Sequence, residues 1–139
     1  MKRFYFTSII ILCLFSCERP FIKLTVSNAY DVLQTRPDSA LFLIRSIDTT
    51  KIMSQRWKSR YALTKAIALD KNYIDTADAS FLMPAVKYFE KYGKPKESME
   101  SYYYLGRIQY NAGDYASSII SLSKALDAGS AQRVPAGAA

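Results

Sequence analysis

The sequence predicts an all-α fold built from paired helices. Glycine and proline are sparse, at five each in 139 residues, and this scarcity favours helices over a turn-rich β-sandwich. Near the C-terminal end, Ile119, Leu122 and Leu126 recur at three- and four-residue spacing, which places them on one face of a helix. Three times in the sequence, a small residue is followed four residues later by a large one, and this recurrence predicts a repeated helical hairpin. The repeats begin at Ala40, Ala85 and Ser118.

Residues 1–17 (MKRFYFTSIIILCLFSC) have the pattern of an export signal. A positively charged start precedes an apolar stretch over residues 4–15, which is shorter than the roughly 20 residues of a membrane-spanning helix. The last four residues (LFSC) resemble the lipobox of bacterial lipoproteins, which implies cleavage before Cys17 and acylation of its thiol. Phe15 is bulkier than the usual residue at its position. The alternative is an ordinary signal peptide or an uncleaved anchor that happens to contain cysteines.

Capping and helix-breaking residues mark the ends of the expected helices. Pro37 suits a first helical turn, whereas Pro84 should kink a helix or delay its start. Gly93 should close that same helix. Gly113 gives the backbone freedom that ends the next one, and the carboxylate of Asp114 can cap the last. The expected helices span residues 23–35, 38–47, 52–71, 79–92, 95–112 and 114–127.

One helical domain over residues 18–128 is expected, followed by a disordered tail over residues 129–139 (GSAQRVPAGAA). The polar stretch 70–78 (DKNYIDTAD) is the expected place for an extended connection, because the first two repeats are 45 residues apart and the next two are 33 apart. Helical arrays normally end in a helix with a polar outer face, which the sequence lacks. Either the last helix leaves an apolar edge open, or the natural protein is longer.

Residues 102–130 resemble a tetratricopeptide repeat. They hold a large aromatic residue, a Leu-Gly pair where two helices touch, a turn, and a small-large-small pattern in the second helix. These features are Tyr102, Leu105 with Gly106, residues 111–115, and Ser118, Leu122 and Ala125. The departures are Gln109, where tyrosine is common, Ser118, where alanine is usual, and Ser130, where proline often ends the unit. The resemblance implies antiparallel hairpins stacked as a short right-handed solenoid of about three hairpins.

Three segments are also similar to the N-terminal region of a tetratricopeptide lipoprotein family of Bacteroides-like bacteria. They are residues 37–41, 61–75 and 102–115. Many relatives are longer and continue to a transmembrane helix and a helix-turn-helix DNA-binding domain. The resemblance therefore implies the sensing or docking portion of such a protein.

The composition argues against an enzyme, a metal site or a cofactor site. There is no histidine, and the two cysteines, Cys13 and Cys17, both lie in the leader. Serine–histidine and cysteine–histidine pairs are therefore excluded, as are thiolate metal clusters. The formal charge is +7, but the basic residues are scattered, and a nucleic-acid groove would need a clustered stripe. We expect no nucleic acid as a partner.

The tetratricopeptide resemblance implies a concave groove, lined by the first helix of each hairpin, that binds an extended peptide or a partner helix. Carried onto the best repeat, the groove positions are Tyr103, Arg107, Tyr110 and Asn111. Tyr61 and Lys65 are expected to face the same groove from the preceding hairpin. Tyrosine offers a large contact area with a hydrogen-bonding tip, and the cations could bind a carboxylate. The alternative is that these tyrosines only pack between hairpins.

Taken together, the sequence favours a lipid-anchored interaction module in the cell envelope, facing the periplasm or lying at the cell surface. Its partners would be an unidentified protein or peptide, and the membrane through acylated Cys17. Two alternatives stay open. One is a truncated fragment of a longer tetratricopeptide, transmembrane and helix-turn-helix regulator. The other is a glycan-binding nutrient lipoprotein.

Overall fold

A computed structural model describes residues 20–131, and within this range every regular element is helical. The all-α prediction is confirmed. The α-helices are α2 (Pro20–Val32), α3 (Pro37–Arg45), α4 (Gln55–Lys71), α5 (Met83–Tyr92), α6 (Pro95–Asn111) and α7 (Tyr115–Ala131). A short 3-10 turn, η1 (Thr49–Lys51), joins α3 to α4. The predicted leader, with Cys17 and its lipobox, lies outside the described residues, as do residues 132–139 of the predicted tail.

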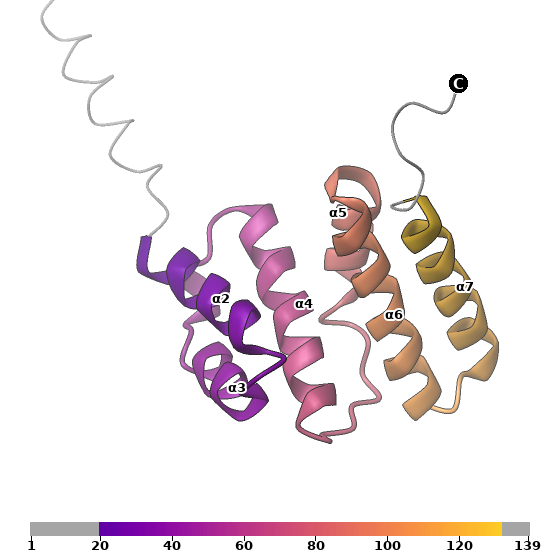
Figure 1. The fold of residues 1–139 in the computed structure, drawn as a ribbon, viewed down its shortest axis with the longest axis horizontal. Helices are drawn as coiled ribbons and strands as arrows, with labels where there is room; N and C mark the ends of the chain where they lie inside the picture. The colour runs from indigo at the N-terminus through magenta and orange to yellow at the C-terminus, as the bar shows by residue number, and fades with distance from the viewer. Residues whose placement is uncertain (1–19, 132–139) are drawn as a thin grey trace, which may run out of the picture.

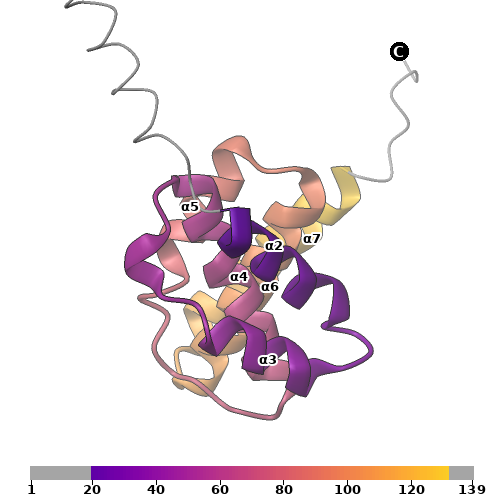
Figure 2. The same cartoon turned by 90° about the vertical axis from the view of Figure 1, so that its left-hand side faces the viewer.

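The helices follow one another in a row, with α2 and α3 at one end and α7 at the other (Figure 1). Helix α2 contacts α3 and α4, helix α4 also contacts α5 and α6, and helix α6 contacts α5 and α7. Figure 2 looks along this row and shows α4 and α6 behind α2. The first helices of the three predicted hairpins therefore form one layer, with α4 at its centre.

Local sequence explains most helix ends. Pro84 occupies the first turn of α5 and delays its start to Met83, four residues after the predicted start, while residues 79–82 form a turn. Helix α4 begins at Gln55 instead of residue 52, because the Ser54 hydroxyl accepts a hydrogen bond from the Trp57 amide at 3.4 Å.

The last hairpin turns as the sequence predicts. Gly113 has a φ of 79°, a left-handed conformation that glycine adopts without steric cost. An oxygen of the Asp114 carboxylate accepts a hydrogen bond from the Ser117 amide at 3.1 Å. Helix α7 then continues to Ala131, so residues 129–131, which the prediction placed in the tail, are helical.

Close backbone packing joins α6 to α7. A Cβ atom on Gly106 would lie 2.8 Å from Cγ of Leu122 and 3.2 Å from the Ser118 carbonyl oxygen, so a larger residue would force Leu122 to shift. The Ser118 hydroxyl donates a hydrogen bond to the Gly106 carbonyl at 2.8 Å. The buried residues of α7 are correspondingly small, namely Ser118, Ser121 and Ala125.

The larger apolar residues of α7 lie mostly outside this contact. Ile119 is 66% exposed, Ile120 is 61% exposed and Leu126 is 76% exposed. Leu122 is half-buried. The buried stripe of α7 passes through its small residues, so Ile119 and Leu126 lie outside the packed contact. Among the residues that the structure describes, α7 thus carries an open apolar face.

Candidate binding groove

A groove of about 1030 Å³ lies against α2, α4, α6 and α7. Its lining is mainly apolar and aromatic and also includes polar side chains. The apolar and aromatic lining residues are Leu33, Ile67, Met99, Leu122, Ala125, Leu126, Tyr30, Tyr103 and Tyr104. Pockets of this kind, apolar with a few polar groups, are the usual form of a ligand site.

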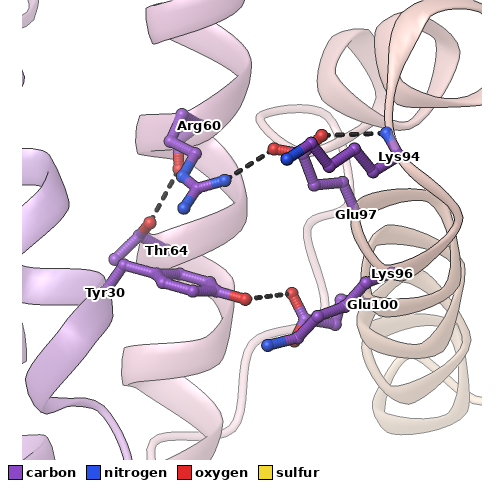
Figure 3. Close-up of polar contacts among 7 residues, drawn as sticks. All are labelled: Tyr30, Arg60, Thr64, Lys94, Lys96, Glu97 and Glu100. Carbon is purple, nitrogen blue, oxygen red and sulfur yellow. Dashed lines mark hydrogen bonds and ion pairs between the residues drawn. The ribbon is translucent and has the colours of Figure 1, made fainter.

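Tyr30 reaches from α2 to Glu100 on α6 (Figure 3). Its hydroxyl donates a hydrogen bond to a carboxylate oxygen of Glu100 at 2.7 Å, which connects α2 to α6. The Arg60 guanidinium lies 4.3 Å from the centroid of the Tyr30 ring, and the Lys96 amine lies 5.5 Å from it. Burial, and then the hydrogen bond to Glu100, raise the pKa of Tyr30 well above its usual value. The phenol therefore stays protonated and keeps donating.

A second polar contact connects α4 to α6. Arg60 donates a hydrogen bond to Glu97 at 2.6 Å, and the side chains are 25% and 10% exposed. The other carboxylate oxygen of Glu97 accepts from the Lys94 backbone amide at 3.0 Å, so Glu97 also caps the start of α6 (Figure 3). The Thr64 hydroxyl donates to the Arg60 carbonyl at 2.8 Å. These contacts fix how α2, α4 and α6 lie around the groove.

The structure places the four predicted residues of α6 at different sites. Tyr103 lines the groove, is 44% exposed, and packs edge-on against Tyr104 with ring centroids 5.0 Å apart. Arg107 instead pairs with Asp70 at the end of α4, through contacts of 3.0 and 2.9 Å. That hydrogen bond raises the pKa of Arg107.

The other two predicted residues of α6 also lie away from the groove lining. Asn111 donates a hydrogen bond to Asp75 at 3.3 Å, and the Tyr110 ring packs against Tyr115 with centroids 5.3 Å apart. Of the four, Tyr103 is therefore the one that the groove includes. Whether the other three contact a partner stays a prediction.

Tyr61 and Lys65 line a separate hollow of about 280 Å³ beside η1, α4 and α5. The Lys65 amine lies 4.8 Å from the centroid of the Phe81 ring. Tyr61 is half-buried, and this burial raises its pKa. The structure does not bring these two residues to Tyr103, because they occupy the face of α4 that turns toward α5.

The prediction missed the contribution of α2 and of the C-terminal half of α7. Tyr30 and Asp31 come from α2, Leu33 comes from the turn after it, and Leu126 and Asp127 come from α7. Helix α2 does not carry the repeat pattern, so the pattern could not place its residues. The expectation that the first helix of each hairpin lines the groove could have pointed to Tyr30 on α2.

Residues 20–131 contain no group of three or more histidine, cysteine, aspartate or glutamate side chains that could hold a metal ion. In the same range, no helix is long and apolar enough to cross a membrane.

The chain matches no family model, no curated protein and no solved structure.

Proposed function

We propose that this protein is a binding module whose groove between α2, α4, α6 and α7 holds a peptide or a helix of a partner protein. The groove itself carries the proposal. Its volume of about 1030 Å³, its apolar lining and its three tyrosines suit the apolar face of an amphipathic segment. Tyrosine is enriched at such sites because it buries a large area and keeps a polar tip.

The architecture that we assign to the module is a short right-handed solenoid of the tetratricopeptide type. The pairs α2–α3, α4–α5 and α6–α7 would be its hairpins. Close packing at Gly106, the turn at Gly113 and the small residue Ser118 on the second helix support this assignment. The layer formed by α2, α4 and α6 would then be the concave, ligand-binding side.

We further propose that the module is lipid-anchored in the cell envelope through Cys17, and the lipobox-like end of the leader supports this. The intact mass of the protein extracted from membranes tests it. We expect the mass of the chain without residues 1–16 plus acyl groups. The Cys17→Ser variant should lose the acyl mass, whereas Cys13→Ser should keep it. An unacylated mass for the unaltered protein would contradict the anchor.

The binding proposal is tested with fluorescein-labelled amphipathic peptides of about 18 residues, which span about 27 Å as helices. Binding to the full chain carrying Cys17→Ser is followed by fluorescence anisotropy. Tyr103→Ala should weaken binding about tenfold, as expected for a central aromatic contact. Tyr110→Ala is the matched control, because it removes an exposed tyrosine of the same helix that lies outside the groove lining.

Equal effects of the two substitutions would contradict the groove as the binding site. A response to oligosaccharides but to none of the peptides would favour the glycan-binding alternative.

A further inference from the structure

The charges that line the groove are mostly negative, although the chain as a whole carries a formal charge of +7. Asp31 on α2, Glu100 on α6 and Asp127 on α7 line it, and among the described lining residues Lys96 alone is positive. The groove therefore differs in sign from the average surface of the protein, and a ligand would meet this local charge first.

Two of these carboxylates have no partner among the described residues. Glu100 accepts the hydrogen bond of Tyr30 and lies 3.7 Å from the Lys96 amine. Asp31 and Asp127 are exposed, and neither pairs with another residue of the range 20–131. They stand on α2 and α7, at opposite ends of the row of helices (Figure 1), with the apolar lining between them. Both are thus free to meet a cation on a bound segment.

Helix electrostatics make the position of Asp31 unfavourable. Asp31 lies in the last turn of α2, where the helix dipole disfavours negative charge, and Asp127 lies four residues before Ala131, the last described residue of α7. The last turns of α2 and α7 hold no basic residue that would offset it. A residue whose charge is unfavourable at its position, and is not offset by another residue of the protein, is a candidate for a functional role. A cation supplied by the ligand would provide the missing compensation.

The opposite charge gathers directly beside the groove. A hollow of about 350 Å³ shares Tyr30 and Lys96 with the groove, and its lining adds Arg56, Arg60 and Lys94 against one carboxylate, Glu97. Arg56 lies in the first turn of α4, which has no acidic residue, and Lys94 is the N-cap residue of α6. Positive charge is disfavoured there in the same way. The groove and the adjoining hollow therefore differ in sign.

We infer that the segment bound in the groove is an amphipathic helix with separated charges, whose lysines or arginines lie between Asp31 and Asp127 and whose acidic residues lie toward Arg56 and Lys94 in the adjoining hollow. This inference rests on the proposed function and names the chemistry of its ligand. The apolar face of the helix covers the lining, and charge complementarity sets its direction.

The test uses four labelled peptides with the same leucine face and different polar faces: charge-separated, all-lysine, all-glutamate and all-glutamine. Binding to the full chain carrying Cys17→Ser is measured by anisotropy at about 0.02 M and about 0.5 M salt. The charge-separated peptide should bind at least about tenfold tighter than the glutamine peptide at low salt, and the difference should shrink at high salt.

Single variants locate the effect. Asp31→Lys and Asp127→Lys should each weaken binding of the charge-separated peptide about three- to fivefold and leave the glutamine peptide unchanged. Both changes place a cation near a helix C-terminus, so the fold should tolerate them. Asp75→Lys is the control, because it changes the charge equally in the exposed connection between α4 and α5, outside the groove lining.

The inference is overturned if the glutamine, glutamate or all-lysine peptide binds as tightly as the charge-separated one. Unchanged binding by both aspartate variants would also overturn it. Dimerisation of the chain that blocks the groove would show that a second copy is the occupant, against the inference. If none of the four peptides binds, the proposed function itself fails, which separates the two claims.

Discussion

Two kinds of contact hold the helices together, and they differ in what they tolerate. Between α6 and α7 the backbones approach closely at Gly106, where an added Cβ would clash with Leu122. Between α2 and α6, across the groove, a hydrogen bond joins Tyr30 to Glu100. The first contact depends on volume, and the second depends on charge and hydrogen bonding. Packing within the hairpin should therefore control stability, whereas the polar contacts should control the shape of the groove.

The largest effect is expected in the packed core. Phe89 on α5 is 2% exposed, and Phe89→Ala should lower the free energy of unfolding by about 3–5 kcal/mol, because it loses apolar burial and leaves a cavity. Tyr92→Ala, on the same helix but 63% exposed, should cost less than about 1 kcal/mol. Urea denaturation followed by circular dichroism measures both. Similar midpoints for the two variants would contradict the assigned core.

The close contact of α6 with α7 is tested by Gly106→Ala. The added Cβ would lie 2.8 Å from Cγ of Leu122, and we expect a net loss of about 1–2 kcal/mol even after the gain in helix propensity. Gly129→Ala offers the same gain in α7 but faces only the flexible side chain of Met99, at 3.1 Å. It should leave stability unchanged or raise it. A stabilising Gly106→Ala would show that the two helices do not pack this closely.

The polar contact of α4 with α6 is tested by Glu97→Gln. Glutamine can still accept the Lys94 amide, but it removes the charge that faces Arg60. Because Arg60 is 25% exposed, water screens part of the loss, and we expect a cost of about 1 kcal/mol. The midpoint of thermal unfolding should fall slightly. A loss as large as that of Phe89→Ala would place this pair with the packed contacts instead.

A separate effect, on the pH dependence of stability, is expected at high pH. Burial, followed by the negative charge of Asp70, raises the pKa of Tyr104 from its ordinary value to about 12. The tyrosine of the unfolded chain ionises near pH 10. The protonated phenol thus stabilises the fold fully below about pH 10, and this contribution is lost as the pH rises toward 12. Tyr104→Phe should make the unfolding free energy less dependent on pH between about 10 and 12, measured by urea denaturation, and an unchanged slope would contradict the shift.

The last hairpin could be predicted from sequence because its determinants are local. Gly106, Gly113, Asp114 and Ser118 lie within a few turns of one another, and each takes the role that its residue type suggests. Pro84 likewise set the start of α5 through a local effect on the backbone. Such local signals can be interpreted without knowledge of the rest of the fold.

The groove could not be predicted in the same way, because residues distant in sequence build it. Tyr30 and Glu100 are 70 residues apart, and nothing in either segment indicates the other. Arg107 shows the converse, since Asp70 at the end of α4 pairs with a cation that the repeat pattern assigned to ligand binding. Which charges stay free for a partner depends on how the helices stack.

The central claim is that the face between α2 and α7 is the binding site. Amide chemical shifts of the full chain carrying Cys17→Ser, recorded while the charge-separated peptide is added, test it most directly. The account predicts that the largest changes fall on Tyr30, Leu33, Met99, Tyr103 and Leu126, which line the groove. Changes centred on Tyr61 and Lys65, in the hollow beside α5, would contradict it, as would uniform small changes over the whole chain.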